Sequence, residues 1–390
     1  MYLKSAQIRH YKSLDNVSLE FSNPITVLVG PNAVGKSNIV DCLRFVRDAV
    51  TADLEHAVSS RGGIGRVRQY SKTKPFKVTV KLDLVQEFDE TSQHAALYEF
   101  TIESQTGSNY TVDSEHAVYF VEADRNNPNS ERQEFSRDKS GVVKFSNHDR
   151  LQQVPSDQLV LGRGLGLSGG AGWPLSVFIR DWRYSAPYPN MLREPASPDK
   201  DKVLTEDGRN WASVIKALRR TIRGKAALDR VYEAMKGVIP AFEDVAVTTV
   251  GSYLVPRFRF ALGGDDTVDF DPVQLSDGTL RVFGILLALY QVPAPKLLVI
   301  EEPEQTVHPG VLGVLADAFR EAAESTQIIV TTHSPHFIDH FEPEQVRVVT
   351  LKNGVTAVSP MKKTQLEAVK RRLMSMQDFM LAEGLLPEET

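Results

Sequence analysis

The sequence predicts an α/β fold: a mixed central sheet, an antiparallel β-subdomain beside it, and a helical lobe inserted into the chain. Short apolar runs at residues 25–29, 297–300 and 327–330 have the length and composition of buried central strands. Residues 76–82 alternate between apolar and polar side chains, as half-buried antiparallel strands do. Apolar positions at helical spacing in residues 211–218 and 226–238 predict the lobe.

The first half of the chain divides into strands, one helix and a β-rich segment. Residues 3–11, 17–21 and 25–29 predict three strands, with a turn at residues 22–24 before the third. A loop follows at residues 30–37, and an amphipathic helix is expected from about residue 38 to residue 49. From residue 76 to about residue 145 the pattern predicts a mostly antiparallel sheet, with strands at 76–82 and 118–121.

The second half begins with the lobe and then returns to the α/β pattern. A glycine-rich stretch at 162–172 precedes the lobe helices, and we expect further helices at 282–290, 310–323 and 364–381. Asn353-Gly354 between apolar runs at 346–351 and 355–358 predicts a hairpin. The predicted division is an N-terminal part of the head at 1–150, the helical lobe at 151–245, and a C-terminal part of the head at 246–390.

Composition excludes several classes of protein. The 390 residues include 45 basic and 50 acidic side chains, and a net charge of −5 does not suit a DNA-coating protein. No stretch reaches the roughly 18–20 apolar residues that span a bilayer, and the N-terminus has no apolar signal core. Cys42 is the single cysteine, which excludes an internal disulfide framework and a multi-cysteine zinc site. We therefore expect a cytoplasmic protein without a membrane partner.

Residues 30–37 fit the pattern G-x-x-x-x-G-K-[ST], with a strand before the loop and a helix after it. In such a loop, backbone N–H groups converge on the phosphates of a nucleotide, and the helix N-terminus adds positive potential. The Lys36 ammonium can reach the β- and γ-phosphates, and the Ser37 hydroxyl can bind Mg²⁺. The predicted nucleotide-binding residues are Gly30, Pro31, Asn32, Ala33, Val34, Gly35, Lys36, Ser37 and Asn38.

A pair of carboxylates follows the apolar run at residues 297–300. Glu301 and Glu302 come at the carboxyl end of a predicted parallel strand, where such sheets place their ligands. Glu301 can hold Mg²⁺ directly or through water, and Glu302 can polarise the water that attacks a γ-phosphate. Because side chains alternate along a strand, the two carboxylates are expected to point apart, which suits two separate roles.

Two further positions complete the predicted site. His333 lies just after the apolar run at 327–330, and beside the other motifs we interpret it as a sensor of the γ-phosphate. Ser276 and Gly278 stand at the start of a predicted helix and form a second anion-binding surface. One nucleotide does not need two such surfaces from one chain, so a second copy of the protein would explain the pair.

Taken together, these motifs resemble the ABC-type ATPase heads of the SMC, RecF and OLD families, and in particular a compact AAA family ATPase branch of prokaryotic defence loci. The resemblance rests on residues 8–14, 30–37, 275–279, 298–304 and 332–334. It implies an ABC-type P-loop ATPase head that uses ATP and Mg²⁺ and hydrolyses ATP with Lys36, Glu302 and His333. It also implies a homodimer in which Ser276 and Gly278 contact the γ-phosphate held by the partner's phosphate loop.

The sequence departs from relatives of this kind in several ways. Transport cassettes usually have Gly at the place of Asp277 and Asp at the place of Glu301, which argues against a transporter. No long heptad arm separates the motifs, so this is not a rod-bearing SMC protein. The glutamine that completes the Mg²⁺ shell in the family has three candidates, Gln152, Gln153 and Gln158.

Unlike an OLD nuclease, the chain continues for only 57 residues after His333, and they contain no D-x-D pattern. Two earlier D-x-D triplets, at residues 199–201 and 269–271, are interpreted as turns. Glycine patterns at 164–169 and 166–170 lack a following helix and are interpreted as a flexible loop. Cys42 is interpreted as a core residue.

Two basic clusters leave open whether they are solvated surfaces or contacts with DNA or an acidic partner. One contains Arg61, Arg66, Arg68, Lys72, Lys74 and Lys77, and the other contains Lys216, Arg219, Arg220, Arg223 and Lys225.

The leading hypothesis is an ATP-driven dimeric switch in anti-phage defence that controls a separately encoded effector, expected to be a nuclease. The alternative is a RecF-like DNA repair ATPase that acts on DNA directly, and a transport cassette ranks third.

Overall fold

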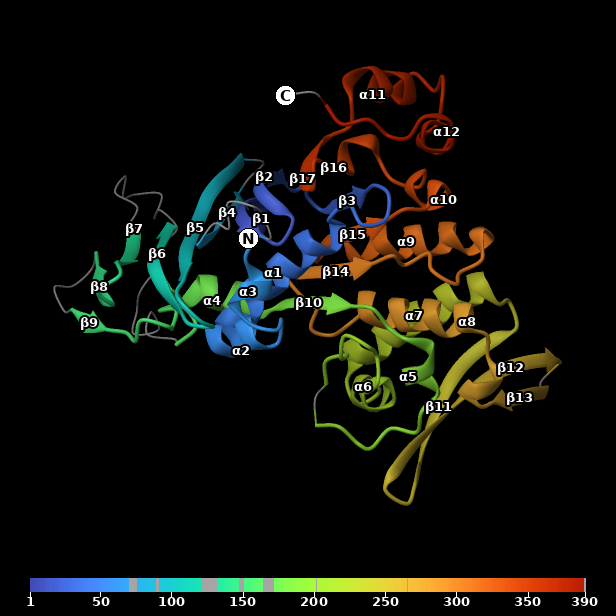
Figure 1. Ribbon diagram of the computed structural model, residues 1–390. Coiled ribbons are helices and arrows are strands. Elements are labelled where there is room, and N and C mark those ends of the chain that lie inside the picture. The colour runs from blue at the N-terminus through green and yellow to red at the C-terminus, as the bar shows by residue number, and fades with distance from the viewer. Residues whose placement is uncertain are drawn as a thin grey trace.

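The computed structural model describes residues 1–69, 76–88, 91–120, 132–146, 151–163, 172–200, 202–264 and 266–388 (Figure 1). Its central sheet has six strands in the order β10-β14-β15-β3-β16-β17. All neighbours in this sheet are parallel except β16 and β17, which pair antiparallel. The strands are β3 Ile25–Val29, β10 Trp182–Ser185, β14 Leu297–Glu301, β15 Gln327–Thr332, β16 Val346–Lys352 and β17 Val355–Pro360. The predicted mixed central sheet is therefore confirmed.

A second sheet has eight strands in the order β2-β1-β4-β5-β6-β7-β8-β9, and its pairings are antiparallel throughout. It contains the strands predicted from residues 76–145 and continues them with the first two strands of the chain. The strands are β1 Tyr2–Tyr11, β2 Leu14–Glu20, β4 Lys77–Phe88, β5 Thr91–Ser104, β6 Tyr110–Phe120, β7 Arg132–Arg137, β8 Val142–Phe145 and β9 Gln152–Gln153.

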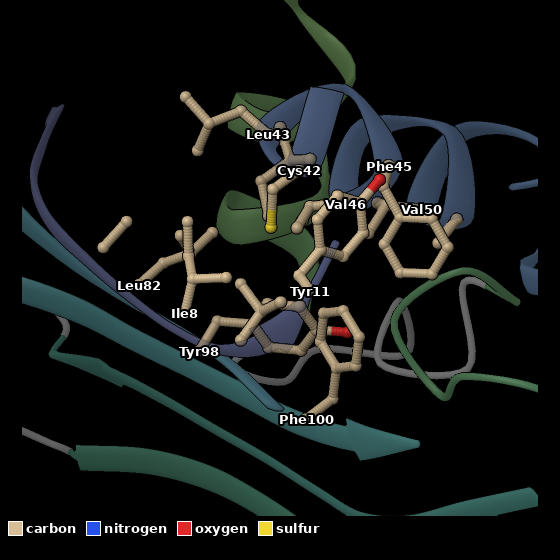
Figure 2. Close-up of a cluster of buried hydrophobic side chains, with 14 of the residues drawn as sticks. Ile8, Tyr11, Cys42, Leu43, Phe45, Val46, Val50, Leu82, Tyr98 and Phe100 are labelled. Carbon is tan, nitrogen blue, oxygen red and sulfur yellow. The ribbon is translucent and has the colours of Figure 1, made fainter. Parts of the chain in front are cut away.

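Helix α1 (Lys36–Thr51) is buried between the two sheets and begins where the phosphate loop ends. Its apolar residues recur at helical spacing, and they join both sheets in one buried cluster. Figure 2 shows Phe45 and Cys42 of α1 above Tyr98 and Phe100 of β5. Cys42 is fully buried, as predicted, and burial raises the pKa of its thiol far above the ordinary value. Short helices α2 (Leu54–Ser59), α3 (Ile64–Val67) and α4 (Gly172–Arg180) surround this core.

A second buried cluster covers the other face of the central sheet. It includes α8 (Asp277–Leu289), which is buried along nearly its whole length, and α9 (Leu312–Ala322). Trp211 and Phe283 meet edge-to-face at 5.3 Å and tie α8 to the lobe. The lobe elements are α5 Pro189–Arg193, α6 Trp211–Leu218, α7 Ile222–Val238 and a three-stranded sheet of β11 Phe242–Val250, β12 Tyr253–Gly263 and β13 Asp266–Phe270.

Residues 151–245 are not helical throughout. Strand β10 pairs with β14 at the edge of the central sheet, and β11 begins the three-stranded sheet at residue 242. The sequence did not reveal β10, because its four residues alternate Trp, Arg, Tyr and Ser rather than forming an apolar run. The division of the chain at residues 150 and 245 stays a prediction.

Two local predictions are wrong. The expected helix at 364–381 is two helices, α11 (Lys363–Lys370) and α12 (Met376–Ala382), because Arg372 adopts a φ of 56° and Ser375 caps a new helix. Asp269 lies in strand β13 rather than in a turn, while Asp271 precedes the 3₁₀ turn η2 (Pro272–Gln274). The triplet at 199–201 and the glycine patterns at 164–170 include residues outside the described ranges.

The remaining C-terminal elements agree with the sequence. The hairpin at residues 346–360 is present, with Asn353 at a φ of 53° and Gly354 at 79°, as a tight two-residue turn requires. Short 3₁₀ turns η3 (Pro309–Val311) and η4 (Pro343–Gln345) and helix α10 (Pro335–Ile338) connect the longer elements. No helix in the described part of the chain is both long and apolar enough to cross a membrane.

Candidate functional site

Three loops that carry predicted site residues leave the same edge of the central sheet. Strands β14, β15 and β3 are neighbours and run parallel, with Glu301 opposite Thr331 and Thr332 opposite Val29. Their carboxyl ends therefore place the carboxylate pair, His333 and the phosphate loop side by side. A cavity of about 460 Å³ is lined by Gly30, His333 and residues of the C-terminal segment 380–387, among others.

The backbone of the phosphate loop fits only with glycine at two positions. A Cβ atom on Gly30 would lie 2.2 Å from the carbonyl oxygen of Val349. Gly35 has a φ of 108°, and a Cβ there would lie 2.1 Å from the Thr356 hydroxyl. Both glycines of the motif are therefore needed to seat the loop against β16 and β17.

Lys36 is held inside the loop that it follows. Its Nζ atom donates hydrogen bonds to the carbonyl oxygens of Gly30 at 2.6 Å and Pro31 at 2.9 Å. Burial lowers the pKa of Lys36, while the carboxylates of Glu302 and Glu304 act in the opposite direction. The ammonium group therefore stands between the loop and the acidic end of β14. Its contact with the phosphates of a nucleotide stays a prediction.

Two residues from distant parts of the chain brace the loop. The Thr356 hydroxyl of β17 donates to the carbonyl oxygen of Val34 at 2.8 Å and contacts the Ser13 hydroxyl at 2.6 Å. The side-chain amide of Asn38 donates to the same Ser13 oxygen at 2.7 Å. Ser13 lies in residues 8–14, one of the stretches that carry the family resemblance. No local sequence pattern predicts the role of Thr356. Neighbouring Asn32 and Ala33 are exposed on the loop, with Ala33 at a φ of 63°.

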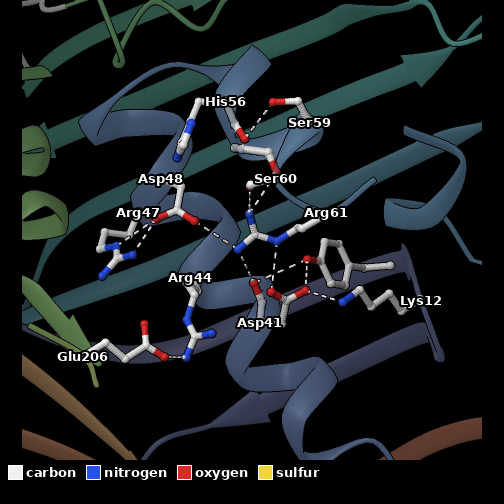
Figure 3. A network of polar contacts seen from close by, with 12 residues as sticks. Lys12, Asp41, Arg44, Arg47, Asp48, His56, Ser59, Ser60, Arg61 and Glu206 are labelled. Carbon is white, nitrogen blue, oxygen red and sulfur yellow. Dashed lines mark hydrogen bonds and ion pairs between the residues drawn. The ribbon is translucent and has the colours of Figure 1, made fainter. Parts of the chain in front are cut away.

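Ser37 and Glu301 lie together, as expected for a metal site. The Ser37 hydroxyl lies near enough to the Glu301 carboxylate to act toward lowering its pKa, and Arg44 Nη2 lies 3.5 Å from Glu301 Oε1. Burial raises the pKa of Glu301, and the nearby Glu206 carboxylate raises it further. The same Arg44 nitrogen pairs with Glu206 at 2.6 Å (Figure 3), so one guanidinium contacts both Glu206 and Glu301.

The donor set fits Mg²⁺ better than a softer metal. A hydroxyl and a carboxylate are hard oxygen ligands, and Mg²⁺ commonly takes one or two protein ligands with water and phosphate oxygens completing its shell. Across the described ranges, no cluster of three or more His, Cys, Asp or Glu side chains could hold a metal ion by itself. Ser37 and Glu301 would therefore hold the ion together with the phosphates of a nucleotide.

Glu302 points in a different direction from Glu301. Its φ is 46°, and its N–H donates to the carbonyl oxygen of Thr331 at 2.9 Å, which turns the chain sharply after β14. Its Oε1 atom lies 3.4 Å from Nδ1 of His333, and its Oε2 atom accepts a hydrogen bond from the Gln305 side chain. The predicted water-polarising carboxylate and the predicted γ-phosphate sensor are therefore direct neighbours.

Glu304 holds the loop that carries His333, a role that the sequence did not reveal. Its Oε1 atom accepts from the Thr332 hydroxyl at 2.6 Å and from the backbone N–H of His333 at 3.1 Å. The same oxygen lies 3.6 Å from Nδ1 of His333. The carboxylates of Glu302 and Glu304 therefore both approach the same ring nitrogen of His333.

Arg281 links the helix that follows Ser276 to the carboxylate pair. Its guanidinium is buried and donates to the carbonyl oxygens of Pro187 at 2.7 Å, Glu301 at 3.2 Å and Glu302 at 3.3 Å. Burial lowers the pKa of Arg281. A side chain of α8 thereby contacts the backbone that carries the predicted metal ligand Glu301 and the predicted catalytic Glu302.

Ser276 and Gly278 form the N-terminus of α8. The Ser276 hydroxyl accepts from the N–H of Thr279 at 3.1 Å, and a Cβ atom on Gly278 would lie 2.6 Å from the carbonyl oxygen of Thr306. Ser276 is exposed, and its side-chain contacts among the described residues are made with Thr279. The two residues therefore lie at an exposed helix N-terminus, and anion binding there stays a prediction.

An ion-pair network fixes α1 to its surroundings and corrects one interpretation of the sequence (Figure 3). Arg61 pairs with Asp41 at 2.9 Å and with Asp48 at 3.1 Å, and only 7% of its side chain is exposed. Burial by itself would raise the pKa of Asp41, but hydrogen bonds from Lys12 and Tyr11 and the Arg61 charge hold it below its ordinary value. Arg61 is therefore a structural anchor rather than part of a solvated or DNA-binding loop.

Other candidates from the sequence lie away from the site. Lys77 pairs with Asp113 at 2.7 Å, and Lys72 and Lys74 fall outside the described residues. Gln152 and Gln153 form β9 at the far edge of the eight-stranded sheet (Figure 1), and the Gln158 carbonyl accepts from the Arg137 side chain. The structure does not bring these three glutamines to the phosphate loop.

Comparison with known proteins identifies the family of the chain. Residues 25–339 match the family model described as "AAA domain, putative AbiEii toxin, Type IV TA system". The chain is 24% identical over 359 residues to the OLD nuclease of Thermus scotoductus, which covers 89% of this chain and 62% of that protein. It is 41% identical over 46 residues to the DNA replication and repair protein RecF of Thermosynechococcus vestitus, which is 12% of each chain.

The fold is that of an SMC head. The crystal structure of the SmcHead bound to the C-winged helix domain of ScpA aligns with a TM-score of 0.58 and 15% identity, and the alignment covers 94% of this chain and 99% of that one. This likeness confirms the predicted ABC-type ATPase head fold. The chain spans less than two thirds of the length of the curated relatives, 62% of the OLD nuclease and 12% of RecF.

Proposed function

Because the chain belongs to this AAA-domain family of ATPases, we propose that it hydrolyses ATP as a dimeric switch whose closed state requires nucleotide on both chains. The observation that carries the proposal is the meeting of three loops at one sheet edge. They bring the Lys36 ammonium, the Ser37–Glu301 pair and the Glu302–His333 pair together. Each pair has a different chemical task in phosphoryl transfer.

The side chains divide the work of hydrolysis. Lys36 neutralises charge on the β- and γ-phosphates, and Mg²⁺ held by Ser37 and Glu301 supplies further positive charge there. Glu302 accepts a hydrogen bond from the attacking water and so orients it toward the γ-phosphate. His333, whose Nδ1 lies 3.4 Å from Glu302, donates to a γ-phosphate oxygen.

The outward-facing N-terminus of α8 supports a site shared between two chains. Ser276 and the backbone around Gly278 offer hydrogen-bond donors at this N-terminus, and the Ser276 hydroxyl bonds within its own helix, while the intervening Asp277 pairs with Arg193 of α5. We infer that this surface closes on the γ-phosphate bound by a second copy of the chain. Arg281 would then couple closure of the dimer to the backbone of Glu301 and Glu302 through its hydrogen bonds.

The output of the switch is proposed from the relatives. We propose a role in prokaryotic anti-phage defence, with a separately encoded effector under the control of the switch, and the likeness to an OLD nuclease over 89% of the chain supports a nuclease as that effector. The match to RecF supports the alternative of a DNA repair ATPase that acts on DNA directly. Hydrolysis stimulated severalfold by duplex DNA favours the alternative, whereas co-purification of a nuclease with the native protein favours the switch.

The dimer is tested in the Glu302→Gln background, where ATP binds but is not hydrolysed. With ATP and Mg²⁺, light scattering should give twice the mass of one chain, and adding Ser276→Arg should restore the single mass without loss of ATP binding. The control is Ser252→Arg, in the exposed turn between β11 and β12, which should dimerise normally. Equal dimerisation of the Ser276→Arg and Ser252→Arg proteins would contradict the shared site.

A further inference from the structure

Arg44 extends from α1 toward strand β10 at the edge of the central sheet (Figure 3). Its guanidinium lies over the ring of Tyr184 in β10, 4.8 Å from the ring centroid. Its Nε atom is buried and has no hydrogen-bond partner among the described residues. The charged end of Arg44 is therefore held by this stacking and by two carboxylates that its Nη2 atom contacts.

The two carboxylates do not hold this nitrogen equally. Nη2 lies 2.6 Å from Oε1 of Glu206 and 3.5 Å from Oε1 of Glu301. Charge-assisted N–H···O bonds are about 2.7–2.9 Å long, so the contact with Glu206 is a close ion pair and the contact with Glu301 is longer than one. Arg44 is therefore drawn toward Glu206, although Glu301 is within its reach.

The turn that carries Glu206 is fixed to the segment that follows β10. The N–H of Ala186 donates to the carbonyl oxygen of Glu206 at 2.8 Å. The N–H of Tyr188 donates to the carbonyl oxygen of Asp207, the next residue of the turn, at 3.1 Å. Because its backbone is tied down on both sides, the Glu206 carboxylate has a fixed base from which to hold Arg44.

Without Glu206, the same guanidinium would turn to Glu301, the other carboxylate that it contacts. Arginine prefers to bind a carboxylate through two parallel N–H···O bonds, which occupy both carboxylate oxygens. Such a pair would take the oxygens with which Glu301 binds Mg²⁺ under the proposed function. It would also place a positive charge directly against the metal site, where that charge repels a divalent cation.

We propose that Glu206 is a positioning residue that holds Arg44 away from Glu301 and so keeps this carboxylate free for Mg²⁺. The inference rests on the proposed function, because it takes Ser37 and Glu301 as the residues that hold the ion. Glu206 acts only through Arg44. Removing Arg44 should therefore make Glu206 dispensable for metal binding.

The test is a double-mutant cycle of Glu206→Gln and Arg44→Met. Gln keeps the size of the Glu206 side chain and removes its charge, and Met keeps most of the length of Arg44 without its cation. The control is Glu194→Gln, which removes one carboxylate from the exposed C-cap of α5. Each full-length chain is studied with mant-AMP-PNP, a fluorescent ATP analogue that is not hydrolysed, so binding is measured without turnover.

The readout is the apparent dissociation constant of Mg²⁺, taken from a Mg²⁺ titration at a fixed concentration of the analogue. Glu206→Gln should raise this constant about 10- to 100-fold, as loss of a residue that orients a metal ligand commonly does. Arg44→Met should bind Mg²⁺ at least as tightly as the wild type, and the double variant should match Arg44→Met within about twofold. The control should match the wild type. Affinity for the analogue in excess EDTA should be equal in all variants, because the phosphate loop is untouched.

Three results would overturn the proposal. The first is an unchanged Mg²⁺ constant in Glu206→Gln. The second is equal weakening by Glu206→Gln with and without Arg44, which assigns Glu206 to the shell of the metal itself. The third is loss of analogue binding by Glu206→Gln in excess EDTA, which assigns Glu206 to the fold. A wild-type chain that binds the analogue without any effect of Mg²⁺ would contradict the metal site and this inference with it, whereas a wild-type chain that binds no analogue would contradict the proposed ATPase as a whole.

Discussion

Replacing Arg281 by Met should destabilise the protein and slow hydrolysis, because this one guanidinium supports the backbone of both carboxylates. Met keeps most of the side-chain length but removes the charge and all five donors. The change leaves the carbonyl oxygens of Pro187, Glu301 and Glu302 without the donor that reaches them at 2.7, 3.2 and 3.3 Å. ATP should still bind, since the phosphate loop is untouched.

The magnitude follows from those distances. The short bond to Pro187 counts as one charge-assisted hydrogen bond, and the two longer bonds share one nitrogen and count together as a second. Two such bonds contribute about 3–6 kcal/mol gross. Burying the charge opposes this, as the lowered pKa of Arg281 indicates, and an apolar side chain recovers part of the loss. We expect a net loss of about 2–4 kcal/mol in the free energy of unfolding, within the range of a broken buried polar network.

The assay has two readouts. Urea unfolding followed by tryptophan fluorescence reports on this region, because Trp211 packs 5.3 Å from Phe283 of the same helix as Arg281. The turnover number for ATP should fall at least tenfold, which corresponds to about 1.4 kcal/mol of lost transition-state stabilisation. Arg219→Met is the control, because Arg219 donates to one backbone carbonyl, that of Val245, and lies away from the carboxylates. This control variant should be about 1 kcal/mol less stable than the wild type, with unchanged turnover.

A loss of stability without a loss of ATP turnover would contradict this prediction. An Arg281→Met protein that is destabilised by about 2 kcal/mol or more but turns over ATP at the wild-type rate would show that Arg281 supports the fold and not the carboxylates.

Further variants test the contacts of Lys36, Arg61, Asp41 and Thr356. Lys36→Ala should abolish binding of a fluorescent ATP analogue, because the substitution removes the ammonium inside the loop. Arg61→Leu should lower the free energy of unfolding by about 1.5–3 kcal/mol, because it removes the charged hydrogen bonds that link Asp41 to Asp48, while Asp41 keeps Lys12 and Asp48 keeps Arg47. The stabilising effect of ionised Asp41, whose pKa is held below its ordinary value, is complete above about pH 4 and should disappear as pH falls through the folded-state pKa; stability curves of wild type and Asp41→Asn should converge there. Thr356→Val should weaken ATP binding about 5- to 30-fold, because it removes the donor to the phosphate loop, and unchanged affinity would exclude a brace at this position.

The sequence predicts those parts of the site whose signals lie close together along the chain. The phosphate loop has all its signals within about 25 residues: an apolar strand, spaced glycines, Lys36 and an amphipathic helix. Glu301, Glu302 and His333 could be grouped because each follows an apolar run, and parallel strands end at one edge. The roles assigned to these residues in hydrolysis stay predictions that the variants above address.

The parts that sequence missed depend on contacts between distant segments. Thr356 reaches Val34 across 322 positions, and Arg281 reaches three carbonyl groups of other segments, so neither leaves a local pattern. Arg61 was misinterpreted because a run of cations suggests a solvated surface, whereas Arg61 lies in the turn after α2 and pairs with Asp41 and Asp48 of α1. The break in the last helix did have a local signal, since Ser375 and Asp378 have the spacing of a capping box.

The position of β3 also governs when the protein can be assembled during synthesis. This buried strand emerges early from the ribosome, yet its two neighbours, β15 and β16, are encoded some three hundred residues later. At a synthesis rate of about 5–20 residues per second, both edges of β3 therefore stay unpaired for roughly 15–60 s. A nascent chain halted before residue 346 has its phosphate motif complete in sequence but lacks β16 and the Thr356 hydroxyl. Full affinity for nucleotide is therefore expected only after translation has passed β17.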